Sequence, residues 1–140
     1  MIAEHQILES ERLLMYQTII NDEFVPQMLT SIRNNIYILG VHICGNIIIA
    51  KHNKFVDFLV PVDNEIASTE YYEYKKFVKL VNALRLRHYG SFSTVSDSLT
   101  ELNRYIEDNE LNSITDPYIV VRDDVDYVYD IYIGISENVT

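Results

Sequence analysis

Two acidic residues stand in the middle of segments that otherwise alternate as β-strands do. Asp57 lies within FVDFLVPV, residues 55–62, and Asp130 lies within YVYDIYIGIS, residues 127–136. Successive side chains of a strand point to opposite faces, so each aspartate shares its face with apolar or aromatic residues. A carboxylate in such surroundings is partly desolvated and is stabilised by a nearby cation. The pattern predicts that Asp130, and with it Asp57, binds a positively charged ligand.

The alternative is that each aspartate is a solvated residue on an exposed sheet face, where most acidic residues lie. The strand around Asp130 is apolar or aromatic on both faces, which favours the binding interpretation there. For Asp57 both interpretations stay open. A ligand counter-charge at Asp130 would be unpaired in the empty protein, so we expect its replacement by asparagine to leave stability unchanged or slightly higher.

The chain contains eleven tyrosines and no tryptophan. Tyr16, Tyr89 and Tyr132 could stack on a planar or cationic ligand, at roughly 0.5–2 kcal/mol per contact. The alternative is structural, because Tyr favours strands and packs half-buried with its hydroxyl in water. We therefore predict a ligand-binding set of five residues: Asp130, Tyr132, Tyr89, Tyr16 and Asp57.

Other chemistry finds little support in the sequence. The four histidines show no metal-ligand spacing with the single cysteine, Cys44, and no phosphate-binding glycine loop or nucleophile elbow is present. No catalytic residue, metal or cofactor is predicted. The basic stretch from Lys75 to Arg87 is better explained as a solvated strand edge pairing with acidic neighbours than as a nucleic-acid site.

Chain length and net charge limit the classes of protein to which this sequence can belong. A chain of 140 residues is expected to form one domain, residues 1–140. The net charge of −10 disfavours direct binding to a phosphate backbone. A lone cysteine, no charged-then-apolar leader and no apolar run that could span a bilayer predict a soluble, cytoplasmic protein without a membrane partner.

The order of expected elements is the same in the two halves of the chain. A strand at 12–20 is followed by a helix at 24–36 and two strands, and a strand within 77–90 is followed by a helix and two strands. The last two are expected to form a hairpin that turns near residues 123–126. We predict an α+β fold of duplicated β-α-β-β repeats. Repeat one spans about 10–63, a linker about 64–76, and repeat two about 77–136.

The halves also match when laid on each other with a single shift. RLLMY (12–16) then falls on RLRHY (85–89), and VDFLVPV (56–62) falls on YDIYIGI (129–135). Tyr16 is thereby matched to Tyr89, and Asp57 to Asp130. Two joined repeats would form one antiparallel sheet with both helices on one face, and the predicted ligand-binding residues would gather in a cleft on the other.

The second half also carries a recognisable series of segments. RLRHYG (85–90) is followed by a helix that ends in NEL (109–111), by DPYIVV (116–121), and by a closing strand with one acidic residue. In this order the segments resemble the GyrI-like effector-binding domain family, which includes the drug-binding domain of BmrR-type transcription regulators. The resemblance implies a duplicated fold that binds bulky, often cationic aromatic molecules between its halves. Family members usually have Glu where this chain has Asp130.

These observations favour three candidate functions. The first is a stand-alone binding protein for amphipathic, cationic aromatic compounds, acting as sensor or sequestering protein and linked to transcription regulation. The second is a hydrolase of reactive small molecules that uses the acidic residue and a Tyr of the cleft, a role that Asp in place of Glu disfavours. The third is an interaction protein with a partner such as a topoisomerase. The natural ligand and a homodimeric state stay open.

Overall fold

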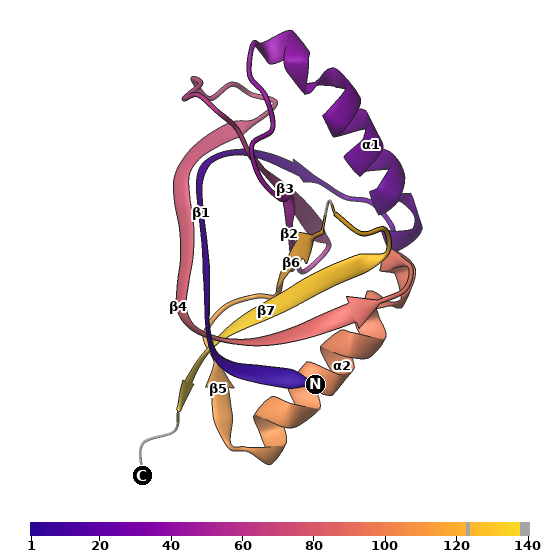
Figure 1. Ribbon diagram of the computed structural model, residues 1–140, viewed down its shortest axis with the longest axis vertical. Coiled ribbons are helices and arrows are strands. Elements are labelled where there is room, and N and C mark those ends of the chain that lie inside the picture. Colours follow the sequence, from indigo (N-terminus) through magenta and orange to yellow (C-terminus); the bar gives the residue numbers. More distant parts are fainter. Residues whose placement is uncertain (123, 138–140) are drawn as a thin grey trace.

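A computed structural model describes residues 1–122 and 124–137 of the chain (Figure 1). The strands are β1 (Ile2–Thr18), β2 (Ile48–His52), β3 (Phe55–Pro61), β4 (Glu73–Tyr89), β5 (Leu111–Ser113), β6 (Tyr118–Val121) and β7 (Val128–Glu137). The helices are α1 (Val25–Asn35) and α2 (Val95–Asp108), each preceded by a short 3-10 turn. The predicted α+β class and the β-α-β-β order are confirmed, with one additional short strand, β5, between α2 and β6. Asp123, which begins the expected turn between the last two strands, lies outside the described residues.

All pairings in the sheet are antiparallel. The strand order is β4-β1-β3-β2-β6-β7-β5, and β4 pairs with β7 as well, so six strands close into a ring. Figure 1 shows α1 and α2 on the same side, while the long strands β1 and β4 curve around the opposite side. The prediction that both helices cover one face of an antiparallel sheet is confirmed.

The two sides of the strands belong to two separate groups of buried side chains. The helix side contains Phe58 of β3 and Ile131 of β7, packed with Leu29 of α1 and Leu102 of α2. We call the other side the inner face, because the middle parts of β1 and β4 lie against it. Its buried apolar residues are Leu8, Leu13, Ile48, Ala50, Leu59, Leu80, Ala83 and Val120. The alternation in β3 and β7 therefore assigned the core residues to the helix side correctly.

Strand β1 is bent and pairs with two strands, β4 and β3. Its register with β4 shifts near Gln6, and His5 and Arg12 have φ angles of 56° and 54°. Such left-handed residues and β-bulges bend a strand and increase its twist. Beyond the bend, β1 pairs with β3 from Leu13 to Thr18.

The two repeats are related by two spacings, not by one. Val25 opens α1 and Val95 opens α2, 70 positions later, and Ile49 pairs directly with Ile119, also 70 positions later. From β3 to β7 the spacing is 73, which makes Asp57 equivalent to Asp130.

The single shift inferred from the sequence is therefore wrong for the first strand of each repeat. Tyr16 pairs with Phe58, and Leu86 makes the equivalent pair with Ile131, so Tyr16 corresponds to Leu86 and not to Tyr89. The cause is the hairpin connection: residues 53–54 join β2 to β3, whereas residues 122–127 join β6 to β7. The match of Asp57 with Asp130 survives because both lie beyond that connection.

The limits of the repeats differ somewhat from those expected. β1 starts at Ile2, before the expected start of repeat one near residue 10, and β4 starts at Glu73, inside the segment 64–76 that was expected to link the repeats. The early part of β1 pairs with β4, so these residues contribute to the junction between the halves.

The packing of α2 can be tested with a core substitution. Leu102 is fully buried among sheet residues of the helix side. Leu102→Ala is expected to lower the free energy of unfolding by about 2–5 kcal/mol, because it removes apolar contacts and leaves a cavity. The measurement is urea denaturation. Val81→Ala, at an exposed position of β4, is the control and should change stability by less than about 0.5 kcal/mol. Equal effects of the two substitutions would contradict this packing.

Candidate ligand-binding site

The structure brings four of the five predicted site residues to the inner face. In β7, Asp130 and Tyr132 point away from the helices, and Asp57 does the same in β3. Tyr89 lies opposite Val128 at the end of β4, where it is 72% exposed. The four residues share one face, but only Asp130 and Tyr132 line the hollow described below, and the role of all four in binding stays a prediction.

Tyr16 is the exception, and the expectation that it shares the inner face is wrong. Its ring packs against the core of the helix side and lies 5.8 Å from the ring of Tyr72. Burial raises the pKa of its hydroxyl, and the nearby Tyr72 raises it further. Met15, the preceding residue, points to the inner face instead.

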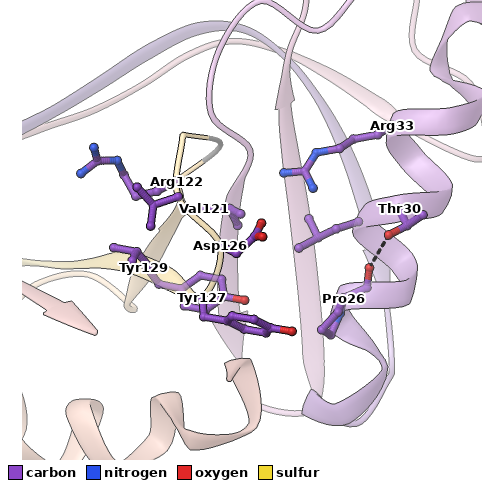
Figure 2. A pocket seen from close by; sticks show the side chains of 11 residues that line it. Pro26, Thr30, Arg33, Val121, Arg122, Asp126, Tyr127 and Tyr129 are labelled. Carbon is purple, nitrogen blue, oxygen red and sulfur yellow. Dashed lines mark hydrogen bonds between the residues drawn. The ribbon is translucent and has the colours of Figure 1, made fainter. Parts of the chain in front are cut away.

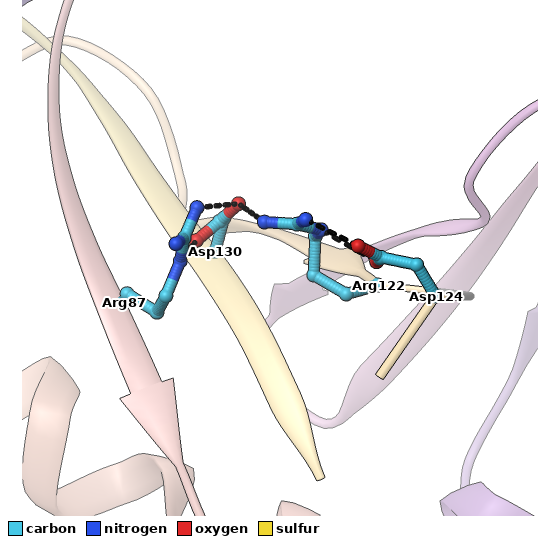
Figure 3. A network of polar contacts seen from close by, with 4 residues as sticks. All are labelled: Arg87, Arg122, Asp124 and Asp130. Atoms are coloured by element: carbon cyan, nitrogen blue, oxygen red, sulfur yellow. Dashed lines mark hydrogen bonds and ion pairs between the residues drawn. The ribbon is translucent and has the colours of Figure 1, made fainter. Parts of the chain in front are cut away.

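Asp130 is buried and paired with arginines. Its carboxylate oxygens accept hydrogen bonds from Nε of Arg87 at 2.7 Å and from a terminal nitrogen of the same guanidinium at 3.3 Å. Arg122 approaches it at 3.4 Å and also binds Asp124 through two contacts of 3.0 and 2.7 Å. Figure 3 shows the four side chains as one line, Arg87, Asp130, Arg122, Asp124. The expectation of an unpaired carboxylate at Asp130 is therefore wrong.

The network keeps both guanidinium groups charged. The hydrogen bonds to Asp130 and its negative charge raise the pKa of Arg87 above its usual range. The hydrogen bonds to Asp124 do the same for the pKa of Arg122, although the neighbouring Arg87 opposes the effect. Two permanent positive charges thus meet the single charge of Asp130.

Asp57 is held in the same way by weaker donors. Its carboxylate accepts a hydrogen bond from the Gln17 amide at 3.0 Å and lies 2.8 Å from Nε2 of His52. Gln17 and Arg87 are equivalent positions of the two repeats, and so are His52 and Arg122, 70 residues apart in each case. Each repeat therefore holds its aspartate with two donors, one from its first strand and one from its hairpin. Only the second repeat uses arginines for both.

A hollow of about 590 Å³ opens on the inner face at the Asp130 end. Its lining includes the basic residues Arg85, Arg87 and Arg122 and the stretch of β1 from Ile7 to Ser10. Tyr132, Ile48 and Val120 provide apolar and aromatic surface. A cavity of this size suits a small organic molecule, for which apolar surface supplies affinity and a few polar groups fix the orientation.

Sequence reasoning missed the arginines and Tyr118. The pairing of β4 with acidic neighbours was expected, and Arg87 confirms it, but the partner becomes clear only from the register that sets Arg87 opposite Asp130. Tyr118 is paired with Tyr132 across β6 and β7 on the inner face. Burial raises the pKa of Tyr118, as do the charges of Asp116 and Asp57, so its hydroxyl stays protonated and can donate a hydrogen bond.

Two other hollows lie on the helix side. One of about 570 Å³ separates α1 from the connection between β6 and β7, and Figure 2 shows Arg33 of α1 and Asp126 of the connection on its two walls. A smaller apolar one, of about 350 Å³, lies between Tyr16, α1 and the Tyr71–Tyr72 pair. Neither contains the paired aspartates of the inner face.

Metal-binding clusters and membrane-spanning helices are absent from the described part of the chain. There, no three His, Cys, Asp or Glu side chains cluster closely enough to hold a metal ion. No helix within residues 1–122 and 124–137 has the length and apolar character needed to cross a membrane.

Known proteins resemble this chain in structure more than in sequence. No protein-family model matches it, and no curated protein does. The C-terminal domain of EcmrR superposes with a TM-score of 0.73 at 12% identity, over 99% of this chain and 98% of that domain. EcmrR in its complex with DNA matches with a TM-score of 0.69 at 12% identity, over 98% of this chain and 58% of that one.

Two further solved structures match with lower TM-scores. SAV2435, solved with bound tetraphenylphosphonium, matches with a TM-score of 0.51 at 11% identity, over 96% of this chain and 94% of that one. A hydrolase from Listeria innocua matches with the same TM-score at 12% identity, over 97% and 90%. At such identities the likeness shows the fold. This chain shares the fold of the EcmrR C-terminal domain, and the GyrI-like resemblance of the sequence is confirmed at the level of the fold.

The ion pairs of Asp130 predict that its replacement by asparagine lowers stability, whereas an unpaired carboxylate would predict unchanged or higher stability. Asp130→Asn keeps the shape but removes the carboxylate partner of Arg87 and leaves Arg122 with Asp124 alone, so we expect the melting temperature to fall by roughly 5 °C. Asp124→Asn is the control, because it also removes one negative charge but lies at an exposed end of the network, with 59% of its side chain in solvent. An unchanged or higher melting temperature for Asp130→Asn would contradict the network.

Proposed function

We propose that this chain is a small-molecule-binding protein that receives an amphipathic, aromatic ligand at the inner face of its sheet. The observation that carries the proposal is the hollow of about 590 Å³ beside Tyr132 and the Asp130 network. The supporting comparison is the shared fold with the EcmrR C-terminal domain and with SAV2435, which was solved with a bound aromatic cation.

The proposed role is that of a cytoplasmic sensor or sequestering protein. A link to transcription regulation is supported by EcmrR, which shares the fold and is solved in a complex with DNA. The net charge of −10 disfavours direct contact of this chain with DNA. A regulatory effect would then pass through a separate DNA-binding partner.

The preference for cationic ligands is proposed for the Asp57 end of the inner face, although Asp57 is not among the residues that line the hollow beside Asp130. Asp130 faces two arginines, so its charge is already balanced. The amide of Gln17 carries no charge, and His52 is 31% exposed and in contact with solvent. Tyr118 lies near Asp57 and offers a ring for stacking on a cation.

The test compares tetraphenylphosphonium with the neutral triphenylphosphine oxide by calorimetry. The cation is expected to bind more tightly, and Asp57→Asn should weaken its binding by about 1–3 kcal/mol, the scale of one charge-assisted contact. The oxide should bind Asp57→Asn as it binds the unchanged protein.

Asp97→Asn serves as the control for the loss of one charge, because Asp97 is an exposed residue of α2 on the other side of the sheet. Equal affinity of the cation and the oxide would show that stacking alone decides binding. Absence of binding by both would overturn the proposed function.

The hydrolase alternative has weaker support. General-base catalysis needs a carboxylate within hydrogen-bond reach of the attacking water. Oxygens of both inner-face aspartates already accept hydrogen bonds from neighbouring side chains. The structural likeness to a Listeria hydrolase concerns the fold alone.

A further inference from the structure

The two ends of the inner face have diverged in charge. Three positions around Asp130 hold arginines: Arg85 and Arg87 on β4, and Arg122 just after β6. The equivalent positions around Asp57 hold Met15, Gln17 and His52. The same backbone frame therefore presents three permanent positive charges at one end and none at the other.

The side chains that line the Asp130 end carry more positive than negative charge, although Asp124, which is outside the lining, pairs with Arg122 and offsets part of its charge. Among the described residues that line the hollow, three arginines meet two carboxylates, Asp130 and Glu9. Glu9 also lies 3.9 Å from Lys79, which offsets part of its charge. This excess is local, since the whole chain carries a net charge of −10.

Arg85 is the arginine that remains available. Arg87 is engaged with Asp130, and Arg122 with Asp124 and Asp130. Within residues 1–122 and 124–137, Arg85 forms no ion pair, although it is only partly exposed and lines the hollow. A guanidinium in this setting offers a planar fork of N–H donors that fits a carboxylate or another oxyanion.

The surface beside Arg85 is aromatic and apolar. Tyr132 lies directly opposite Arg85 on β7, and Ile48 and Val120 continue the wall of the hollow. A ring placed against Tyr132 would carry an acidic substituent within the range of Arg85. The opposite end, where Met15 replaces Arg85, lacks this donor.

We propose that the hollow at the Asp130 end binds the anionic group of an aromatic acid, with Arg85 as the residue that recognises its oxyanion. Arg87 and Arg122 reinforce the positive field and are held in place by Asp130. The inference rests on the proposed binding of small molecules and names the class of ligand at one end of the inner face. It differs from the proposed cation site, which lies at the Asp57 end.

The test uses 2-naphthoate and the uncharged 2-naphthamide, which have nearly the same shape. Naphthoate should bind at least about tenfold more tightly, as expected of one charge-assisted contact at a partly exposed site. Arg85→Met, which installs the residue of the equivalent position, should remove about tenfold of the naphthoate affinity and leave naphthamide unchanged. Arg85→Lys should retain part of the preference, because it keeps the charge and loses the fork.

Arg104→Met is the matched control, because it removes the same charge from an exposed position of α2. Its naphthoate affinity should equal that of the unchanged protein. An equal loss in Arg104→Met and Arg85→Met would overturn the proposal by showing that only the net charge matters. A melting-temperature measurement on each variant confirms that the folded protein is being compared.

The outcomes separate this inference from the proposed function. If naphthamide and tetraphenylphosphonium bind while naphthoate shows no advantage, the anion site is overturned and small-molecule binding stands. If none of the three binds, both are overturned. A tenfold naphthoate preference that is lost in Arg85→Met and kept in Asp57→Asn supports the anion site at the Asp130 end.

Discussion

A buried carboxylate bridged by two guanidinium groups organises the inner face of this sheet. Asp130 joins β7 to Arg87 on β4 and to Arg122, just beyond β6, so three neighbouring parts of the sheet meet at one charge. A buried ion needs such partners, since its desolvation would otherwise be very costly. The arrangement fixes the arginines along the wall of the hollow, and it also explains why Asp130 is poorly suited to act as the counter-charge of a ligand.

The two repeats place equivalent aspartates at the two ends of the inner face. Each repeat supplies an aspartate at the same place, held by one donor from the repeat's first strand and one from its hairpin. The donors differ between the repeats: Gln17 and His52 in the first, Arg87 and Arg122 in the second. The same frame can therefore present two ends of different charge to one ligand-binding face.

Strand alternation and helical periodicity predicted much of the fold. They identified α1, α2 and the helix-facing residues of β3 and β7, and they matched Asp57 with Asp130 correctly. The match of Tyr16 with Tyr89 as equivalent positions was wrong. The longer connection between β6 and β7 changes the spacing between the two repeats, which a single shift cannot represent. The partners of Asp130 could not be predicted from the sequence, because they depend on the register of β4 with β7 and on the bend of β1.

The most direct test of the account is where a ligand binds. Backbone amide chemical shifts can be followed while the isotope-labelled protein is titrated with 2-naphthoate. The account predicts the largest changes at residues 85–87 of β4, at Val120 and at residues 130–132 of β7, which surround the hollow of the inner face. Changes confined to residues 26–33 and 125–129, which line the hollow beside α1, would contradict it.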